Sequence, residues 1–239
     1  MSAKLYVVAA SHPCWATARA LELKGIPYRR VEWPPTMHVP MQRLRFGQGT
    51  VPGLTIDGEK LVGSRRIMER LDELVPDPTL RSSDLRLREA NRWGDEVLQS
   101  LARRLTWWTL RRRPSAIRSY AQDSKLPFPG FVTQGLTPAI SRVEWRINDV
   151  SDDSARRDLQ ALPGHLDQVD AWIAEGLLGD DVPNAADLQI GSSIALLRTK
   201  LDVRPLISGR PAERLATSQF AGFPGEVPAG TFPRGWLPT

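Results

Sequence analysis

The alternation of hydrophobic and polar positions in the first third of the chain predicts a small unit that mixes strands and helices. A continuous apolar run at 5–9 is typical of a strand buried on both faces. The next segment carries apolar residues at helical spacing and ends at Gly25 and Pro27, which together terminate a helix. Residues 28–33 alternate as a strand does, and 39–46 suit a short irregular helix.

A hairpin and a second helix complete this unit. Asp57-Gly58 separates two apolar runs at 51–56 and 59–62, and this dipeptide favours a type I′ turn because both central residues of that turn need positive φ. Ser64 can cap the helix that follows, whose apolar residues fall on one face as far as Val75. The order is therefore βαβ, a connection, and ββα, which is the thioredoxin-like arrangement.

The pattern becomes almost wholly helical after a break at Pro76-Asp77-Pro78. Helical spacing covers 84–112 as one helix or two, then 137–149 and 154–175. Residues 185–198 are apolar nearly all round, so they predict a central buried helix. The last 18 residues hold eight Pro or Gly and predict an irregular tail rather than a packed element.

These patterns predict an α/β thioredoxin-like N-terminal domain followed by an all-α helical-bundle C-terminal domain. The expected boundaries are 1–76 for the first domain, 77–83 for a linker, 84–221 for the helical domain and 222–239 for the tail.

Composition and cysteine usage narrow the class of protein. The 239 residues are 41% hydrophobic and 25% charged, as in an ordinary soluble protein, and no apolar run reaches membrane-spanning length. One cysteine excludes an internal disulfide, and with no signal peptide in view we expect a cytoplasmic protein. Three scattered histidines and one cysteine predict no metal site.

The net charge of +5 owes much to an arginine-rich segment formed by Arg103, Arg104 and 111–113. Such a segment can bind nucleic acid or a small anion, or simply face water. No nucleic-acid motif accompanies it, so we expect a solvated face and no nucleic-acid partner.

Ser11 carries the candidate chemistry. It leaves the buried strand at the mouth of a helix, where backbone N–H groups and the helix dipole favour an anion. A thiolate is an anion often kept in such a place, which predicts a thiol-handling site. Cys14 lies three residues later without a cysteine at position 11, so exchange between two thiols of this chain is excluded. A buried helical cysteine is the expectation for Cys14, and a mixed disulfide is the alternative.

Four local matches, in order along the chain, resemble the glutathione transferase family. They are Ser11 ahead of the Lys-Gly-Ile-Pro-Tyr ending at 24–28, the Val51-Pro52 pair, Ser64 at a helix start, and Pro-Asn-Ala-Ala-Asp at 183–187. The resemblance implies an enzyme in which Ser11 stabilises the thiolate of glutathione, which attacks a small hydrophobic electrophile in a detoxification-type conjugation. It also implies a homodimer, with no metal.

The resemblance further assigns roles to individual residues. Glutathione would contact His12, Val51, Pro52, Gly63 and Ser64, and the electrophile would lie against Trp107 or Trp108. Adjacent helical residues point about 100° apart, so only one of the two tryptophans is expected to face the pocket. The remaining match, Asn184 with Asp187, is expected to be a structural capping box.

The chain departs from the family pattern at three positions. Gly63 stands where the family usually has an acidic residue, Thr50 replaces a residue that is often lysine or glutamine, and His12 separates Ser11 from Pro13. The acidic residue normally pairs with the amino group of glutathione, so its loss weakens the inference that this chain binds glutathione. A transferase-fold binding protein without turnover, or an enzyme that uses a different thiol, is therefore the alternative.

Overall fold

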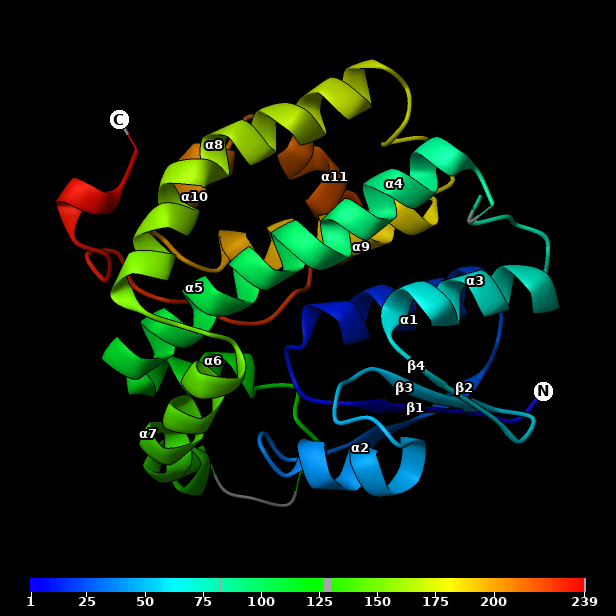
Figure 1. Ribbon diagram of the computed structural model, residues 1–239, viewed down its shortest axis with the longest axis horizontal. Helices are drawn as coiled ribbons and strands as arrows, with labels where there is room; N and C mark the ends of the chain where they lie inside the picture. Colours follow the sequence, from blue (N-terminus) through cyan, green and yellow to red (C-terminus); the bar gives the residue numbers. More distant parts are fainter. Residues whose placement is uncertain (82, 127–129, 239) are drawn as a thin grey trace.

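A four-stranded mixed sheet organises the N-terminal part in the computed structural model, which describes residues 1–81, 83–126 and 130–238 (Figure 1). The strand order is β2-β1-β3-β4; β1 is parallel to β2, and the other two pairings are antiparallel. Leu5 lies opposite Leu54, and Leu54 opposite Leu61, so one buried row of leucines crosses three strands. The strands are β1 (Ala3–Val7), β2 (Tyr28–Glu32), β3 (Gly53–Ile56) and β4 (Glu59–Val62).

The predicted hairpin is confirmed, and the first strand is displaced from its prediction. Asp57 and Gly58 have φ values of 45° and 89°, as the type I′ turn requires. Strand β1 ends at Val7 instead of residue 9. The apolar run continues past the strand because residues 8–10 line a cavity rather than pair with a neighbouring strand.

Two helices, α1 (His12–Leu23) and α3 (Ser64–Leu74), cover the face of the sheet that points toward the helical part of the chain, and α2 (His38–Phe46) covers the other face (Figure 1). Helix α1 ends as the sequence predicts, with Gly25 at a φ of 63°. This order of strands and helices confirms the thioredoxin-like arrangement.

Lys24 fastens the end of α1 to α3 and to the chain that leaves it. Its buried ammonium donates to Asp72 Oδ1 at 2.6 Å and to the carbonyl oxygens of Val75 and Pro78 at 2.7 and 2.6 Å. Three acceptors match the three N–H groups of an ammonium, so the buried charge is compensated. The lysine of the 24–28 match therefore connects the end of α1 to α3 and to the residues that follow α3.

The rest of the described chain is almost wholly helical, as predicted. Helices α4 and α5 form one continuous run with a π-helical turn between them, so 84–112 is a single interrupted helix. Gly94 begins this turn, where a Cβ would come within 2.9 Å of Ile190 Cγ1 on α9. The helical elements are α4 (Leu85–Trp93), the π turn (Gly94–Leu98), α5 (Gln99–Arg112), a 3-10 turn (Pro114–Ala116), α6 (Ile117–Tyr120), α7 (Gly130–Ile147), α8 (Asp152–Ala174), α9 (Ala185–Arg198), α10 (Arg204–Ile207), α11 (Pro211–Phe220) and a 3-10 turn (Arg234–Trp236).

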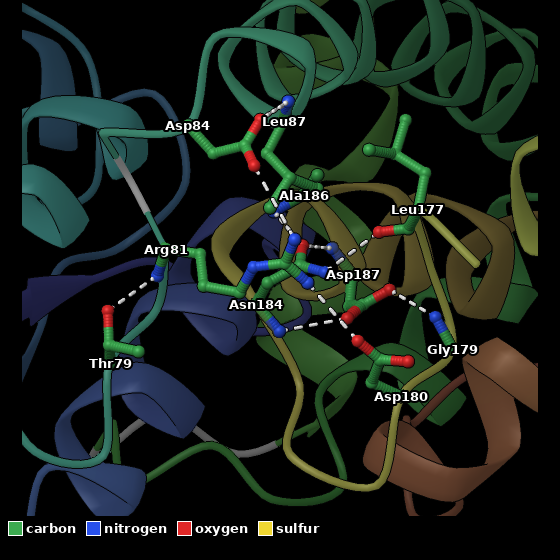
Figure 2. A network of polar contacts seen from close by, with 10 residues as sticks. All are labelled: Thr79, Arg81, Asp84, Leu87, Leu177, Gly179, Asp180, Asn184, Ala186 and Asp187. Carbon is green, nitrogen blue, oxygen red and sulfur yellow. Dashed lines mark hydrogen bonds and ion pairs between the residues drawn. The ribbon is translucent and has the colours of Figure 1, made fainter.

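Helix α9 is the central buried helix that its apolar pattern predicted, since every residue from 185 to 197 is buried. The expected capping box opens it: Asn184 Oδ1 accepts from the N–H of Asp187 at 3.0 Å, and Asp187 Oδ2 accepts from the N–H of Asn184 at 2.8 Å (Figure 2). Asp187 Oδ1 also accepts from the N–H of Gly179 at 2.9 Å. Burial raises the pKa of Asp187 to about 6. The box thus satisfies backbone donors that have no access to water.

Replacing Asn184 with alanine is expected to lower the free energy of unfolding by about 2 kcal/mol, because it removes a cap and leaves buried N–H groups unpaired. Urea unfolding measures this change. Ser151→Ala is the matched control, since Ser151 caps α8 in the same way, at 3.0 Å from the N–H of Ser154, but is exposed. Equal losses in the two variants would contradict the role given to burial.

The C-terminal tail has little regular structure, as predicted, but the expectation that it is unpacked is wrong. Phe232 is 3% exposed and stacks on Trp108 with ring centroids 4.9 Å apart. The Asp202 carboxylate accepts from the backbone N–H groups of residues 230, 231 and 232 at 2.7 to 2.9 Å. Proline and glycine prevent a helix here, yet they do not prevent aromatic side chains from filling the core.

Candidate functional site

A cavity of about 190 Å³ lies where the N-terminal unit meets helices α5 to α7. Ser11, His12 and Val51 line it from the N-terminal side, and Trp107 lines it from α5. The structure therefore brings together four of the residues that the resemblance assigns to catalysis, glutathione and electrophile. Pro52, Gly63, Ser64 and Trp108 do not line this cavity.

Ser11 stands at the N-cap of α1 but does not cap it with its side chain. Its backbone carbonyl accepts from the N–H groups of Cys14 and Trp15 at 2.9 and 3.1 Å, so the start of the helix is held by main chain alone. Ser11 lines the cavity, and its hydroxyl acts on the neighbouring Cys14 thiol by lowering the pKa of that thiol. A hydroxyl that is not used for capping is available to a ligand.

Cys14 is a buried, protonated thiol. Its side chain is 3% exposed, and desolvation raises its pKa to about 11 against the opposing effect of the Ser11 hydrogen bond. The thiolate is the reactive form, and at neutral pH it is scarcely populated here. Burial therefore agrees with the expectation of a buried helical cysteine.

The backbone of Val51 faces the cavity without a partner. The Val51–Pro52 peptide is cis, and the Pro52 carbonyl accepts from the N–H of Gly63 at 3.0 Å. Among the described residues, Val51 itself takes part in no hydrogen bond through its N–H or its carbonyl. Both groups are thus free to pair with an extended peptide.

Ser64 uses its hydroxyl inside the protein instead of in the cavity. The side chain is 3% exposed, and its Oγ donates to Gln189 Oε1 on α9 at 2.8 Å. Gly63, immediately before it, has φ and ψ of 89° and 136°, a conformation that side-chain-bearing residues rarely adopt. Glycine at this position is therefore explained by the backbone, and Ser64 joins the N-terminal unit to the central helix.

The two adjacent tryptophans of α5 point in different directions, as the helical geometry predicts. Trp107 lines the cavity, and its backbone carbonyl accepts from Trp145 Nε1 at 3.0 Å. Trp108 is completely buried between Phe232 and Trp236, and its Nε1 donates to Asp152 Oδ1 at 3.0 Å. The assignment of Trp108 to the pocket is therefore corrected: it belongs to the core that the tail completes.

Both histidines of the cavity wall are neutral at neutral pH. His12 is 2% exposed; desolvation lowers its pKa well below the usual value, and the charges of Arg103 and Lys200 lower it further. Its Nε2 has no hydrogen-bond partner among the described residues. Desolvation, with Arg103, also lowers the pKa of His38 to about 4.

His38 is expected to make stability fall in mild acid. Its pKa in the folded protein is about 4, below the unfolded value of about 6.5, so the unfolded chain binds more protons between these pH values. The contribution is complete above the unfolded pKa and is lost as pH falls toward 4. For this residue we expect a loss of about 2 kcal/mol between pH 7 and pH 5.

Urea unfolding of the wild type and of His38→Gln at both pH values measures this effect. The difference between the two proteins cancels other titrating groups such as Asp187, whose raised pKa acts in the opposite direction. A pH-independent difference would overturn the assignment of a neutral His38.

The sequence did not single out several polar groups of the cavity, and it assigned Arg103 to the solvent. Arg103 lies at the cavity wall one helical turn before Trp107, a spacing that would have placed it there. Glu144 and Asn148 of the α7 region line the same cavity; Asn148 Nδ2 donates to Glu144 Oε2 at 3.0 Å, and burial raises the pKa of Glu144.

Other arginines of the basic segment are engaged with protein groups at the surface. Arg104 holds both oxygens of Asp158 at 2.7 and 2.8 Å, and Arg112 reaches Asp152 Oδ1 at 2.7 Å. The guanidinium of Arg111 lies 4.0 Å from the Trp145 ring centroid. The segment is therefore not one continuous solvated patch.

A metal site and a membrane-spanning helix are both absent from the residues that the structure describes. No cluster of three or more His, Cys, Asp or Glu among them could hold a metal ion. None of the helices in that part of the chain combines the length and hydropathy needed to cross a membrane.

Comparison with known proteins agrees with this architecture. Residues 5–79 match the family model of the glutathione S-transferase N-terminal domain. No curated protein matches the sequence. A glutathione S-transferase of Ceriporiopsis subvermispora in complex with glutathione has a TM-score of 0.61 at 14% identity, covering 92% of this chain and 96% of that one.

Two bacterial structures are similar over comparable lengths. A glutathione S-transferase of Methylobacterium radiotolerans in complex with glutathione sulfonate has a TM-score of 0.54 at 18% identity, covering 95% of each chain. The beta-etherase LigF of a Sphingobium strain has a TM-score of 0.54 at 18% identity, covering 92% of this chain and 99% of that one. Residues 5–79 therefore resemble the N-terminal domain of glutathione S-transferases, and over its length the chain has the fold seen in glutathione transferase structures.

Proposed function

We propose that this protein is an enzyme that binds glutathione and joins it, through its sulfur atom, to a small electrophile. The observation that carries the proposal is one cavity lined by Ser11, by Val51, whose backbone has no hydrogen-bond partner among the described residues, and by Trp107. The first can hold a thiolate, the second an extended peptide and the third an apolar co-substrate. Glutathione complexes of proteins with the same fold support the choice of thiol.

Ser11 has the position and the hydrogen-bond capacity for the central step. The Ser11 hydroxyl does not cap α1, and the buried Cys14 thiol stays protonated at neutral pH, so the Ser11 O–H is available to the ligand. Donation of that O–H to the ligand sulfur favours the thiolate over the thiol. The thiolate then attacks the electrophile, forming a C–S bond while the leaving group departs or a proton is taken up.

The backbone of Val51 would align the peptide. An extended ligand that donates to the Val51 carbonyl and accepts from its N–H forms a short antiparallel pairing. Gly63 provides no carboxylate for the amino group of glutathione, so binding rests on fewer charged contacts than the resemblance implies. We therefore place the affinity in the range from micromolar to low millimolar.

Calorimetric titration with glutathione tests the proposal directly. The wild type should bind, and the ultraviolet absorbance of the bound thiolate should titrate below the pKa of free glutathione. Ser11→Ala should raise the pKa of the bound thiol by about one to two units, the worth of one hydrogen bond to a charged group. Ser83→Ala, an exposed linker serine, is the control and should leave that pKa unchanged.

Absence of glutathione binding by the wild type would contradict the proposal. Binding without any lowering of the thiol pKa would favour the second candidate, a transferase-fold binding protein without turnover, for which Gly63 is the specific observation.

A further inference from the structure

Arg103 is a guanidinium without a partner in the wall of the cavity. It lines the cavity from α5, and within the described part of the chain it forms no ion pair and donates no hydrogen bond. Its neighbour Arg104, by contrast, is fully matched to the Asp158 carboxylate. Desolvation lowers the pKa of Arg103 without bringing it near neutrality, so the group stays charged.

The nearby carboxylates do not neutralise this charge. Glu144 and Asp95 act on Arg103 electrostatically but form no ion pair with it. Asp95 Oδ2 instead forms an ion pair with Arg65 Nε at 3.2 Å, and Glu144 Oε2 accepts a hydrogen bond from Asn148 Nδ2. Arg103 is thus a half-buried cation in the cavity wall to which the described residues offer no hydrogen-bond acceptor, so an anion in the cavity could pair with it without displacing a protein group.

The histidines of the wall do not compete for that anion. His12 and His38 are neutral at neutral pH, and Arg103 itself contributes to the lowering of both pKa values. His12 Nε2 is buried without a partner, so the cavity offers a second polar atom to a ligand. Arg103 is then the dominant positive charge that a cavity ligand meets.

The position of Arg103 on α5 connects it to the apolar wall. Arg103, Trp107 and Leu110 follow one another at i, i+4 and i+7, so they share one face of the helix and all line the cavity. One helical turn separates successive residues by about 5.4 Å along the axis. A flat ring packed against Trp107 therefore reaches Arg103 with a substituent at its edge.

We propose that Arg103 binds a carboxylate of the electrophile, so that the co-substrate class of this cavity is a small aromatic or unsaturated carboxylic acid. The role of this acid as co-substrate rests on the proposed transferase function, whereas the binding of an anion to Arg103 does not. The guanidinium fork presents two parallel N–H groups to a carboxylate, which gives orientation as well as affinity. Bound in this way, the acid holds its reactive carbon near Ser11, where the thiolate of glutathione is proposed to lie.

Binding of para-nitrobenzoate and of para-nitrobenzamide tests the site, because the two rings differ only in charge. We expect the wild type to bind the acid at least tenfold more tightly than the amide at low salt, in line with a hydrogen-bonded charge pair. Arg103→Gln should remove this preference and leave the affinity for the amide within about twofold, while Arg103→Lys should keep part of it. Arg113→Gln, an exposed arginine that follows the same helix, should behave like the wild type.

Stability and glutathione binding complete the test. Since Arg103→Gln removes an unpaired charge, its melting temperature should not fall below that of the wild type. A wild type without preference for the acid, or an Arg103→Gln protein that keeps the preference, would overturn the inference. Loss of glutathione binding in Arg103→Gln with an unchanged acid preference would also overturn it and assign Arg103 to the thiol ligand. Failure of the wild type to bind glutathione would overturn only the proposed function.

Discussion

Ser11→Ala is expected to reduce kcat/KM for conjugation of glutathione roughly a hundredfold at neutral pH. Removal of one preorganised donor to a developing or stabilised anion typically has an effect of this size. Without the hydroxyl, the ligand sulfur is held as the unreactive thiol, and the rate should recover as pH is raised. Initial rates over a range of pH, with a generic halogenated nitroarene, measure both effects.

Two variants separate the hydroxyl from the shape of the site. Ser11→Thr keeps a hydroxyl and should keep most of the activity, whereas Ser83→Ala should not change it. Cys14→Ala removes the buried thiol beside Ser11 and should alter the rate much less than Ser11→Ala. If the Ser11→Ala enzyme has wild-type activity and an unchanged pH profile, the proposal that Ser11 stabilises the thiolate is wrong.

Phe232→Ala is expected to lower the free energy of unfolding by about 3–5 kcal/mol, although position 232 lies in a tail without regular secondary structure. The side chain is 3% exposed and stacks on the fully buried Trp108. Truncation therefore removes a large apolar area and an aromatic contact and leaves a cavity beside Trp108. Chemical denaturation, followed by tryptophan fluorescence, measures the loss.

Leu85→Ala is the control for this prediction. Leu85 is also a large apolar residue at the edge of a regular element, but it is 74% exposed, so the expected change is within about 0.5 kcal/mol. A loss under about 1 kcal/mol in Phe232→Ala would mean that the tail is dispensable for the core.

The architecture could be predicted from the order of residues alone, because local periodicity encodes it. The Asp57-Gly58 turn, the Gly25 end of α1 and the all-apolar helix at 185–198 each depend on residues close together in the chain. The capping box of Asn184 and Asp187 is of the same kind, since its partners are three residues apart. Such features can be predicted from the sequence because they do not depend on residues that are distant in the chain.

Half of the candidate site could also be predicted from the sequence. Ser11 was placed by its position between a strand and a helix, and Val51 was assigned by the resemblance; both residues line the cavity. Between Trp107 and Trp108, helical geometry predicted that only one faces the pocket but not which one. That choice depends on Phe232, more than a hundred residues away.

The partners of the polar side chains, in contrast, depend on contacts that form only when the chain folds. Ser64 looked like a ligand contact, yet Gln189 of α9 takes its hydroxyl. Arg103 was expected to face solvent, yet the structure places it in the cavity wall with no ion-pair partner among the described residues. Whether a hydroxyl or a guanidinium is free depends on acceptors brought near by folding, and the hydrophobic pattern that specifies the fold contains no information about those pairings.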